Sequence, residues 1–140
     1  MMKAIGLLLS LVLLATGAQA QTANEKSELS EKCGKQAAER FEKDWGTGVF
    51  NHTDGRQTNS NYEHHYNSRL HKCIYLEVRD TQKSGRPPLR MLTLLDLHGK
   101  RAIGKYRKLE GDRFAVCWVQ GEPCKSEEEW RALIKSFMED

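Results

Sequence analysis

Apolar positions in the first twenty residues form one nearly unbroken run and do not alternate with polar positions. The run covers residues 5–15, follows Lys3 and ends before Ala18-Gln19-Ala20. A stretch of about a dozen apolar residues is too short to cross a bilayer core of about 30 Å. A charged start and a small-x-small end are typical of a signal peptide. We therefore predict a signal peptide over residues 1–20, cleaved near Ala20, and no transmembrane segment after cleavage. A retained N-terminal anchor is the less favoured alternative.

Two later segments have the period of an amphipathic helix. In residues 28–45 an apolar side chain recurs at every fourth position, and glycines follow directly. Residues 126–139 combine a second apolar stripe with Ser126 and Glu129, which fit a capping box. We predict a helix in each segment and expect residues 21–27 to be frayed.

Between the helices, short runs rich in aliphatic and aromatic residues predict strands. Gly, Pro, Asn and Asp separate these runs, and the connections are too short for crossover helices. Residues 47–61 have no period and predict a long loop. The expected fold is α+β: an N-terminal helix, an antiparallel meander of three to four strands and a C-terminal helix, with the helices covering one face of the sheet. The runs from which these strands would form cover residues 62–67, 72–80, 89–97, 101–109 and 114–119.

Size and charge restrict the function classes. The residues from 21 to 140 are enough for one small domain. The formal net charge of the full chain is only +3, which indicates no polyanionic partner. Export makes nucleic acid an unsuitable partner, and no motif for a cofactor is present, so we expect none.

The four cysteines all follow the predicted signal peptide. An even number of cysteines in an exported chain predicts disulfides, and four allow three pairings. Gly121 and Pro123 can turn the chain between the last two cysteines. We therefore favour the pairs Cys33–Cys73 and Cys117–Cys124. A zinc site is the less favoured alternative, because no C-x-x-C is present.

Three of the five histidines lie within residues 64–71. Imidazole is a common ligand of transition metals. A turn after Asn67 would bring His65 and His71 together, with Glu63 as a third ligand. This metal site is a hypothesis, and ordinary histidines on polar strand faces are the favoured alternative.

A basic hairpin, defined by Arg101, Lys105, Tyr106 and Arg107, is the candidate partner-binding surface. Such a surface would suit an acidic partner, lipid headgroups or the anionic cell envelope. The favoured alternative is a solvated strand edge, where positive charge discourages sheet-to-sheet association.

The order of several motifs resembles a group of short secreted proteins of proteobacteria that have no assigned activity. The resemblance rests on four segments: Cys33-x-x-x-Ala37, His65-Tyr66-Asn67-x-x-Leu70-x-Lys72-Cys73, Cys117, and Cys124-Lys125-Ser126-Glu127-Glu128-Glu129-Trp130. It implies that His65-Tyr66-Asn67 is a feature of the group. It implies no substrate, cofactor or catalytic residue.

No catalytic motif is present: the chain lacks G-x-S-x-G, and its cysteines are expected to be paired. The sequence therefore favours a periplasmic or secreted binding module without catalytic activity, of which an inhibitor or immunity-type protein is one form. Its expected partner is another envelope or secreted protein. The first alternative is a small metal-binding protein that uses residues 64–71, and the second is an unrecognised hydrolase.

Overall fold

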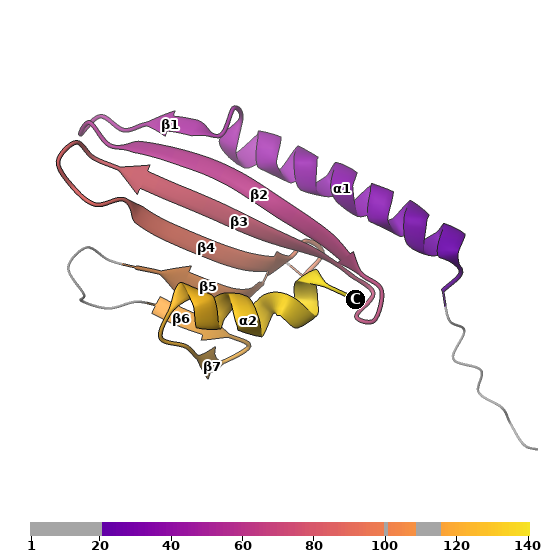
Figure 1. Ribbon diagram of the computed structural model, residues 1–140. Helices are drawn as coiled ribbons and strands as arrows, with labels where there is room; N and C mark the ends of the chain where they lie inside the picture. Colours follow the sequence, from indigo (N-terminus) through magenta and orange to yellow (C-terminus); the bar gives the residue numbers. More distant parts are fainter. Residues whose placement is uncertain (1–20, 100, 109–115) are drawn as a thin grey trace, which may run out of the picture.

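The computed structural model describes residues 21–99, 101–108 and 116–140, and a meandering antiparallel sheet runs through them (Figure 1). The seven described strands lie in the sheet in the order in which they occur in the chain. The predicted α+β class is confirmed, with seven strands in place of three to four. The predicted signal peptide lies outside the described residues. The elements are α1 (Ala23–Trp45), β1 (Val49–Asn51), β2 (Gln57–Asn67), β3 (Lys72–Gln82), β4 (Leu89–Asp96), β5 (Ala102–Arg107), β6 (Val116–Val119), β7 (Glu122–Pro123) and α2 (Glu127–Met138).

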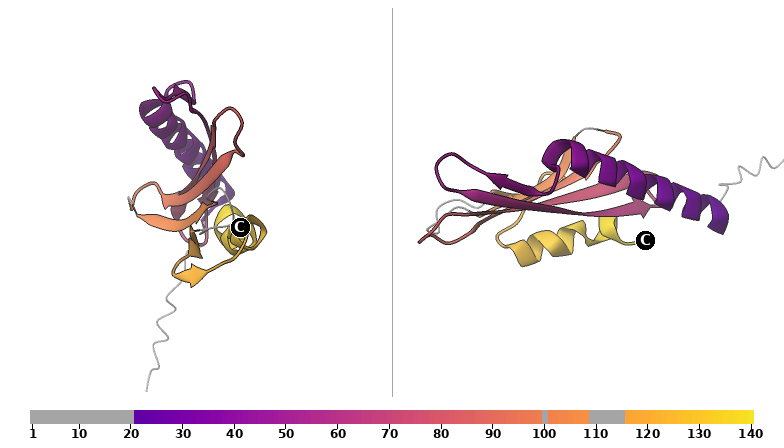
Figure 2. Two further views of the ribbon diagram at one scale, coloured as in Figure 1. Left: turned by 90° about the vertical axis from the view of Figure 1, so that its left-hand side faces the viewer. Right: turned by 90° about the horizontal axis from the view of Figure 1, so that it is seen from above.

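The two helices cover opposite faces of the sheet, so the expectation that both cover one face is wrong (Figure 2). Strand β3 explains the arrangement, because it places apolar side chains on both faces of the sheet. Cys73 faces α1 and forms a disulfide with Cys33 there. Ile74 and Leu76 point the other way and pack with residues of α2. A strand that is apolar on both sides needs cover on both sides.

The main hydrophobic core lies between the sheet and α2. Trp130 is completely buried there, and its indole Nε1 donates a hydrogen bond to the carbonyl oxygen of Trp118 at 3.2 Å. Gly104 lies against the same carbonyl oxygen of Trp118. A Cβ at this position would be only 3.0 Å from that oxygen, so the close packing here suits a glycine. The buried residues of this core are Ile74, Leu76, Leu92, Leu94, Tyr106, Cys117, Val119, Trp130, Ile134 and Phe137.

Helix α1 buries much less than α2. Among its residues only Cys33 and Ala37 are fully buried. Its remaining packing is mainly aromatic, since Phe41 lies 4.9 Å from the ring of Tyr62, which stacks on Tyr75 at 5.4 Å. The disulfide to Cys73 therefore supplements a weak apolar contact.

Two predicted boundaries on the N-terminal side are wrong. Thr22 and Glu25 form a complete capping box, so α1 begins at Ala23 and residues 21–27 are not frayed. The predicted loop over residues 47–61 contains β1 and the beginning of β2. Strand β2 is mostly polar and has no clear apolar alternation of its own. It is held extended because it pairs along its whole length with the apolar strand β3.

Both predicted disulfides, Cys33–Cys73 and Cys117–Cys124, are confirmed, and no cysteine is free. Disulfides persist in oxidising compartments, so they are consistent with an extracytoplasmic location. None of the helices in the described ranges has the length and apolar character to cross a membrane.

Candidate functional site

Three adjoining cavities open at one end of the sheet, around Arg56. Their volumes are about 330, 540 and 570 Å³, and Arg56 lines all three. The largest cavity reaches the end of α1 at Asp44 and Trp45, and the other two lie against the β3–β4 turn. We call the three together the basic hollow.

Positive charge dominates the lining of the basic hollow. Among its described lining residues, Asp44 carries the single carboxylate, and Arg40 is its ion-pair partner. The basic side chains that line it are Arg56, Arg79, Lys83, Arg86 and Arg107. An excess of one sign of charge in a concave surface concentrates the opposite charge from solution. The hollow is therefore suited to an anionic ligand.

Trp45, Arg79 and Met91, which line the largest cavity, belong to a network of contacts around the buried carboxylate of Glu77. Glu77 accepts from Trp45 Nε1 at 3.0 Å and pairs with Arg79 Nε at 2.8 Å. The Arg79 guanidinium also lies over the Trp45 ring, 5.4 Å from its centroid, and donates to the sulfur of Met91. Such pairing lets a carboxylate be buried. Arg79 is thus held rigidly, with its charge balanced by Glu77.

The wall formed by the β1–β2 hairpin is partly aromatic. Phe50 is 54% exposed and lies edge-on to His52, with 4.8 Å between the ring centroids. His52 Nε2 is 2.8 Å from the hydroxyl of Thr58, which is hydrogen-bonded in turn to Thr81. A large exposed aromatic side chain beside rigid polar groups is a common feature of binding surfaces.

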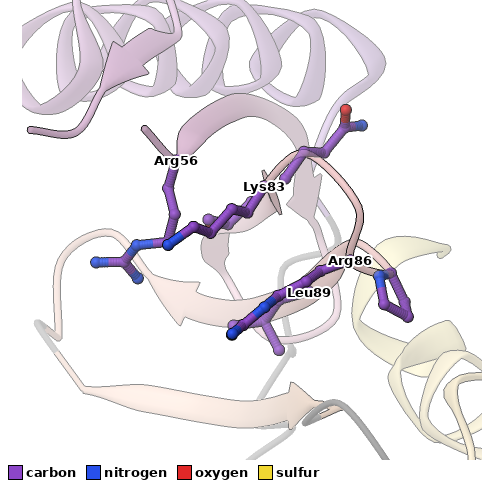
Figure 3. Close-up of a pocket in the computed structure, with 7 residues that line it drawn as sticks. Arg56, Lys83, Arg86 and Leu89 are labelled. Atoms are coloured by element: carbon purple, nitrogen blue, oxygen red, sulfur yellow. The ribbon is translucent and has the colours of Figure 1, made fainter. Parts of the chain in front are cut away.

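Arg56 is held in place by Asp54 at the tip of the same hairpin. The Arg56 backbone N–H donates to Asp54 Oδ1 at 3.2 Å, and its Nε donates to Oδ2 at 2.7 Å. The backbone hydrogen bond is the main cause that lowers the pKa of Asp54, and the charges of Arg56 and Lys83 add to it. Arg56 and Lys83 both line the smallest cavity, and Figure 3 shows the Lys83 side chain extended toward Arg56.

The structure separates the residues of the predicted basic hairpin. Arg107 lines the basic hollow, and Lys105 is exposed on the same face of β5. Tyr106 points to the opposite face, is only 6% exposed and belongs to the main core, where burial raises its pKa. Arg101 is exposed just before β5, at the other end of this strand from Arg107. The hollow therefore brings together only part of the predicted surface.

The predicted metal ligands do not gather into one cluster. His65 Nε2 lies 3.3 Å from Asp140, Glu63 is exposed on β2, and His71 is exposed in the β2–β3 turn with φ of 51°. Within residues 21–99, 101–108 and 116–140, no three His, Cys, Asp or Glu side chains are placed to share a metal ion. The metal site stays a prediction.

Sequence reasoning missed Arg56, Arg79 and Lys83. Arg56 lies in the segment predicted as an irregular loop, and Lys83 in a turn. The signal that would have found them is the register of the β2–β3 hairpin, which pairs Gln57 with Gln82 and so brings the two turns to one edge.

Comparison of the chain with known protein families, curated proteins and solved structures finds no match.

Proposed function

We propose that this protein is a binding module without catalytic activity, located in the periplasm or outside the cell, that binds an acidic surface of another protein. The observation that supports this most directly is the basic hollow: five basic side chains line it, and Asp44 is the one carboxylate among the lining residues described. Asp54 and Glu77 pair with Arg56 and Arg79 from outside this lining. An inhibitor or immunity-type protein, which blocks an enzyme by covering it, is one form of this function.

The surroundings of the hollow support a protein partner. Phe50 offers an exposed aromatic ring, and Trp45 and Met91 line the largest cavity beside it. Interfaces between proteins commonly combine aromatic residues, Met and Arg. Lys105 and Arg107 extend the positive charge along the face of β5.

Rigidity favours the same function. The disulfide Cys33–Cys73 ties α1 to β3, and the network of Trp45, Glu77 and Arg79 fixes the end of that helix on the sheet. Side chains that are already ordered lose little conformational entropy on binding. We expect the hollow to change little when the partner binds.

The test is a quantitative capture from extracts of the native host with three immobilised forms of the protein. These are the wild type, Lys105→Glu with Arg107→Glu, and a control with the same charge change, Lys32→Glu with Lys35→Glu, on the exposed face of α1. We expect one protein to bind the wild type and the control but not the first variant, and its binding to weaken with salt. Equal capture by all three forms would refute the use of this surface.

A further inference from the structure

We propose that the smallest cavity of the basic hollow, between Arg56 and Lys83, is a binding site for a phosphate-class oxyanion. The cavity has a volume of about 330 Å³ and is lined by Arg56, Thr81, Gln82, Lys83, Arg86, Pro87 and Leu89. This proposal concerns a small anion and does not depend on the protein partner proposed above.

The first argument is the register of the β2–β3 hairpin. The last pair of this antiparallel ladder is Gln57 with Gln82, so Arg56 and Lys83 are the next residues on the two chains. Both line the same cavity. Like charges at opposite positions of neighbouring strands destabilise a sheet. An anion between the two side chains would turn this repulsion into attraction.

The second argument is the balance of charge and of hydrogen-bonding groups. No carboxylate is present among the described lining residues of this cavity. Asp54 is the nearby acid, and it is occupied by the backbone and the Nε of Arg56. Lys83 makes no ion pair with any residue in the described ranges, and its charge is only the last of the causes that lower the pKa of Asp54. Lys and Arg side chains are donors only, so they call for a ligand that is rich in acceptors.

The third argument is that the donors are carried by two hydrogen-bonded turns. In the first, the His52 N–H donates to the Arg56 carbonyl at 2.8 Å. In the second, the Arg86 N–H donates to the Lys83 carbonyl at 3.0 Å. Gly85 supplies the positive φ of 77° that this second turn needs. The backbone of both turns is therefore ordered before the ligand arrives.

Phosphate fits these features better than a single carboxylate does. It carries between one and two negative charges at pH 7, because the second pKa is about 7 for inorganic phosphate and about 6 for a phosphate monoester, and it offers acceptors in several directions. Arg binds such oxygens in a forked geometry and Lys as a point charge. The volume of the cavity is about ten times the roughly 30 Å³ that one water takes in the liquid, so the anion can keep part of its hydration.

The experiment is a titration of the full mature protein, with both disulfides formed, with inorganic phosphate. Amide ¹H–¹⁵N spectra and calorimetry are recorded at constant ionic strength, with chloride as the reference anion. We expect saturable shifts confined to the two turns, with a Kd of about 1 mM or lower. Affinity should fall as the pH is lowered through about 7, where inorganic phosphate gains a proton. Binding of sulfate, which stays doubly charged, should not fall.

Matched variants locate the site. Lys83→Gln should weaken phosphate binding about tenfold or more, because it removes a charge-assisted hydrogen bond. Lys83→Arg should retain binding, and Lys32→Gln, on the far part of α1, should bind like the wild type. Amide spectra of each variant show that it is folded. Arg56 is left unchanged, since its bonds to Asp54 order the turn.

A second ligand identifies the source of the phosphate group. Phenyl phosphate places an apolar ring on the same anion, and Phe50 lies in the adjoining cavity. The two ligands are compared at about pH 8, where both are doubly charged. Tighter binding of phenyl phosphate would then assign the site to a phosphorylated molecule, and equal binding to free phosphate. Shifts no larger than those caused by chloride, or equal binding by Lys83→Gln, would overturn the proposal.

Discussion

Removing the two disulfides one at a time should destabilise the protein unequally. Cys33–Cys73 closes a loop with a sequence separation of 40, and Cys117–Cys124 one of 7. In the chain-entropy account, the contribution grows with the logarithm of loop length. It comes to about 3.9 kcal/mol for the longer loop and about 2.4 kcal/mol for the shorter one, a difference of about 1.5 kcal/mol. Packing acts in the same direction, since Cys33 and Cys73 are both fully buried.

The assay is urea unfolding of the wild type, of Cys33→Ala with Cys73→Ala, and of Cys117→Ala with Cys124→Ala. The first pair of substitutions should lower the free energy of unfolding more than the second pair does, by at least the difference of about 1.5 kcal/mol that the loop lengths imply. Hydrogen exchange adds a local test, because α1 buries little else than Cys33 and Ala37. We expect α1 to lose protection in the first variant while α2 keeps it. The reasoning is refuted if the short loop proves to contribute as much as the long one.

Three further substitutions test particular contacts. Asn67→Ala should destabilise the protein by about 1–3 kcal/mol in urea unfolding, because the buried amide donates to the last carbonyls of α2 and its oxygen accepts from the β2–β3 turn. Trp130→Ala should cost about 3–5 kcal/mol by the same assay, through the cavity it leaves and the lost bond to Trp118. Burial alone would raise the pKa of Asp96, but hydrogen bonds, first from Lys72, lower it. Asp96→Asn should therefore reduce the melting temperature at pH 7. The difference from the wild type should vanish as the pH falls through and below about 4, where the carboxyl gains a proton. A difference that is the same at every pH would contradict a stabilising role of the Asp96 charge.

The sequence predicted those elements whose own residues carry a clear pattern. The stripe from Cys33 to Trp45 and the capping serine at Ser126 each identify a helix without help from the rest of the chain. The disulfide pairs followed from the spacing of the cysteines and from Gly121 and Pro123. Local signals of this kind survive folding, because the interactions behind them lie within a few residues.

Features that depend on pairing between distant residues were not predictable. Strand β2 has almost no apolar alternation, and its extended form comes from its ladder with β3. The placement of α1 and α2 on opposite faces depends on Cys73 and Ile74 pointing in opposite directions. Only part of the basic hollow was recognised from the sequence, for the same reason. Arg107 meets Arg56 at one hollow only after the sheet has formed.

Native mass spectrometry of the protein recovered gently from its own host tests the proposed binding function most directly. We predict a species whose mass fits residues 21–140 with two disulfides, bound to one second protein that dissociates as the ionic strength rises. The same preparation of the Lys105→Glu, Arg107→Glu variant should contain the first protein alone. A bare, oxidised monomer from the wild type, or a complex that survives in the variant, would contradict the role that we assign to the basic hollow.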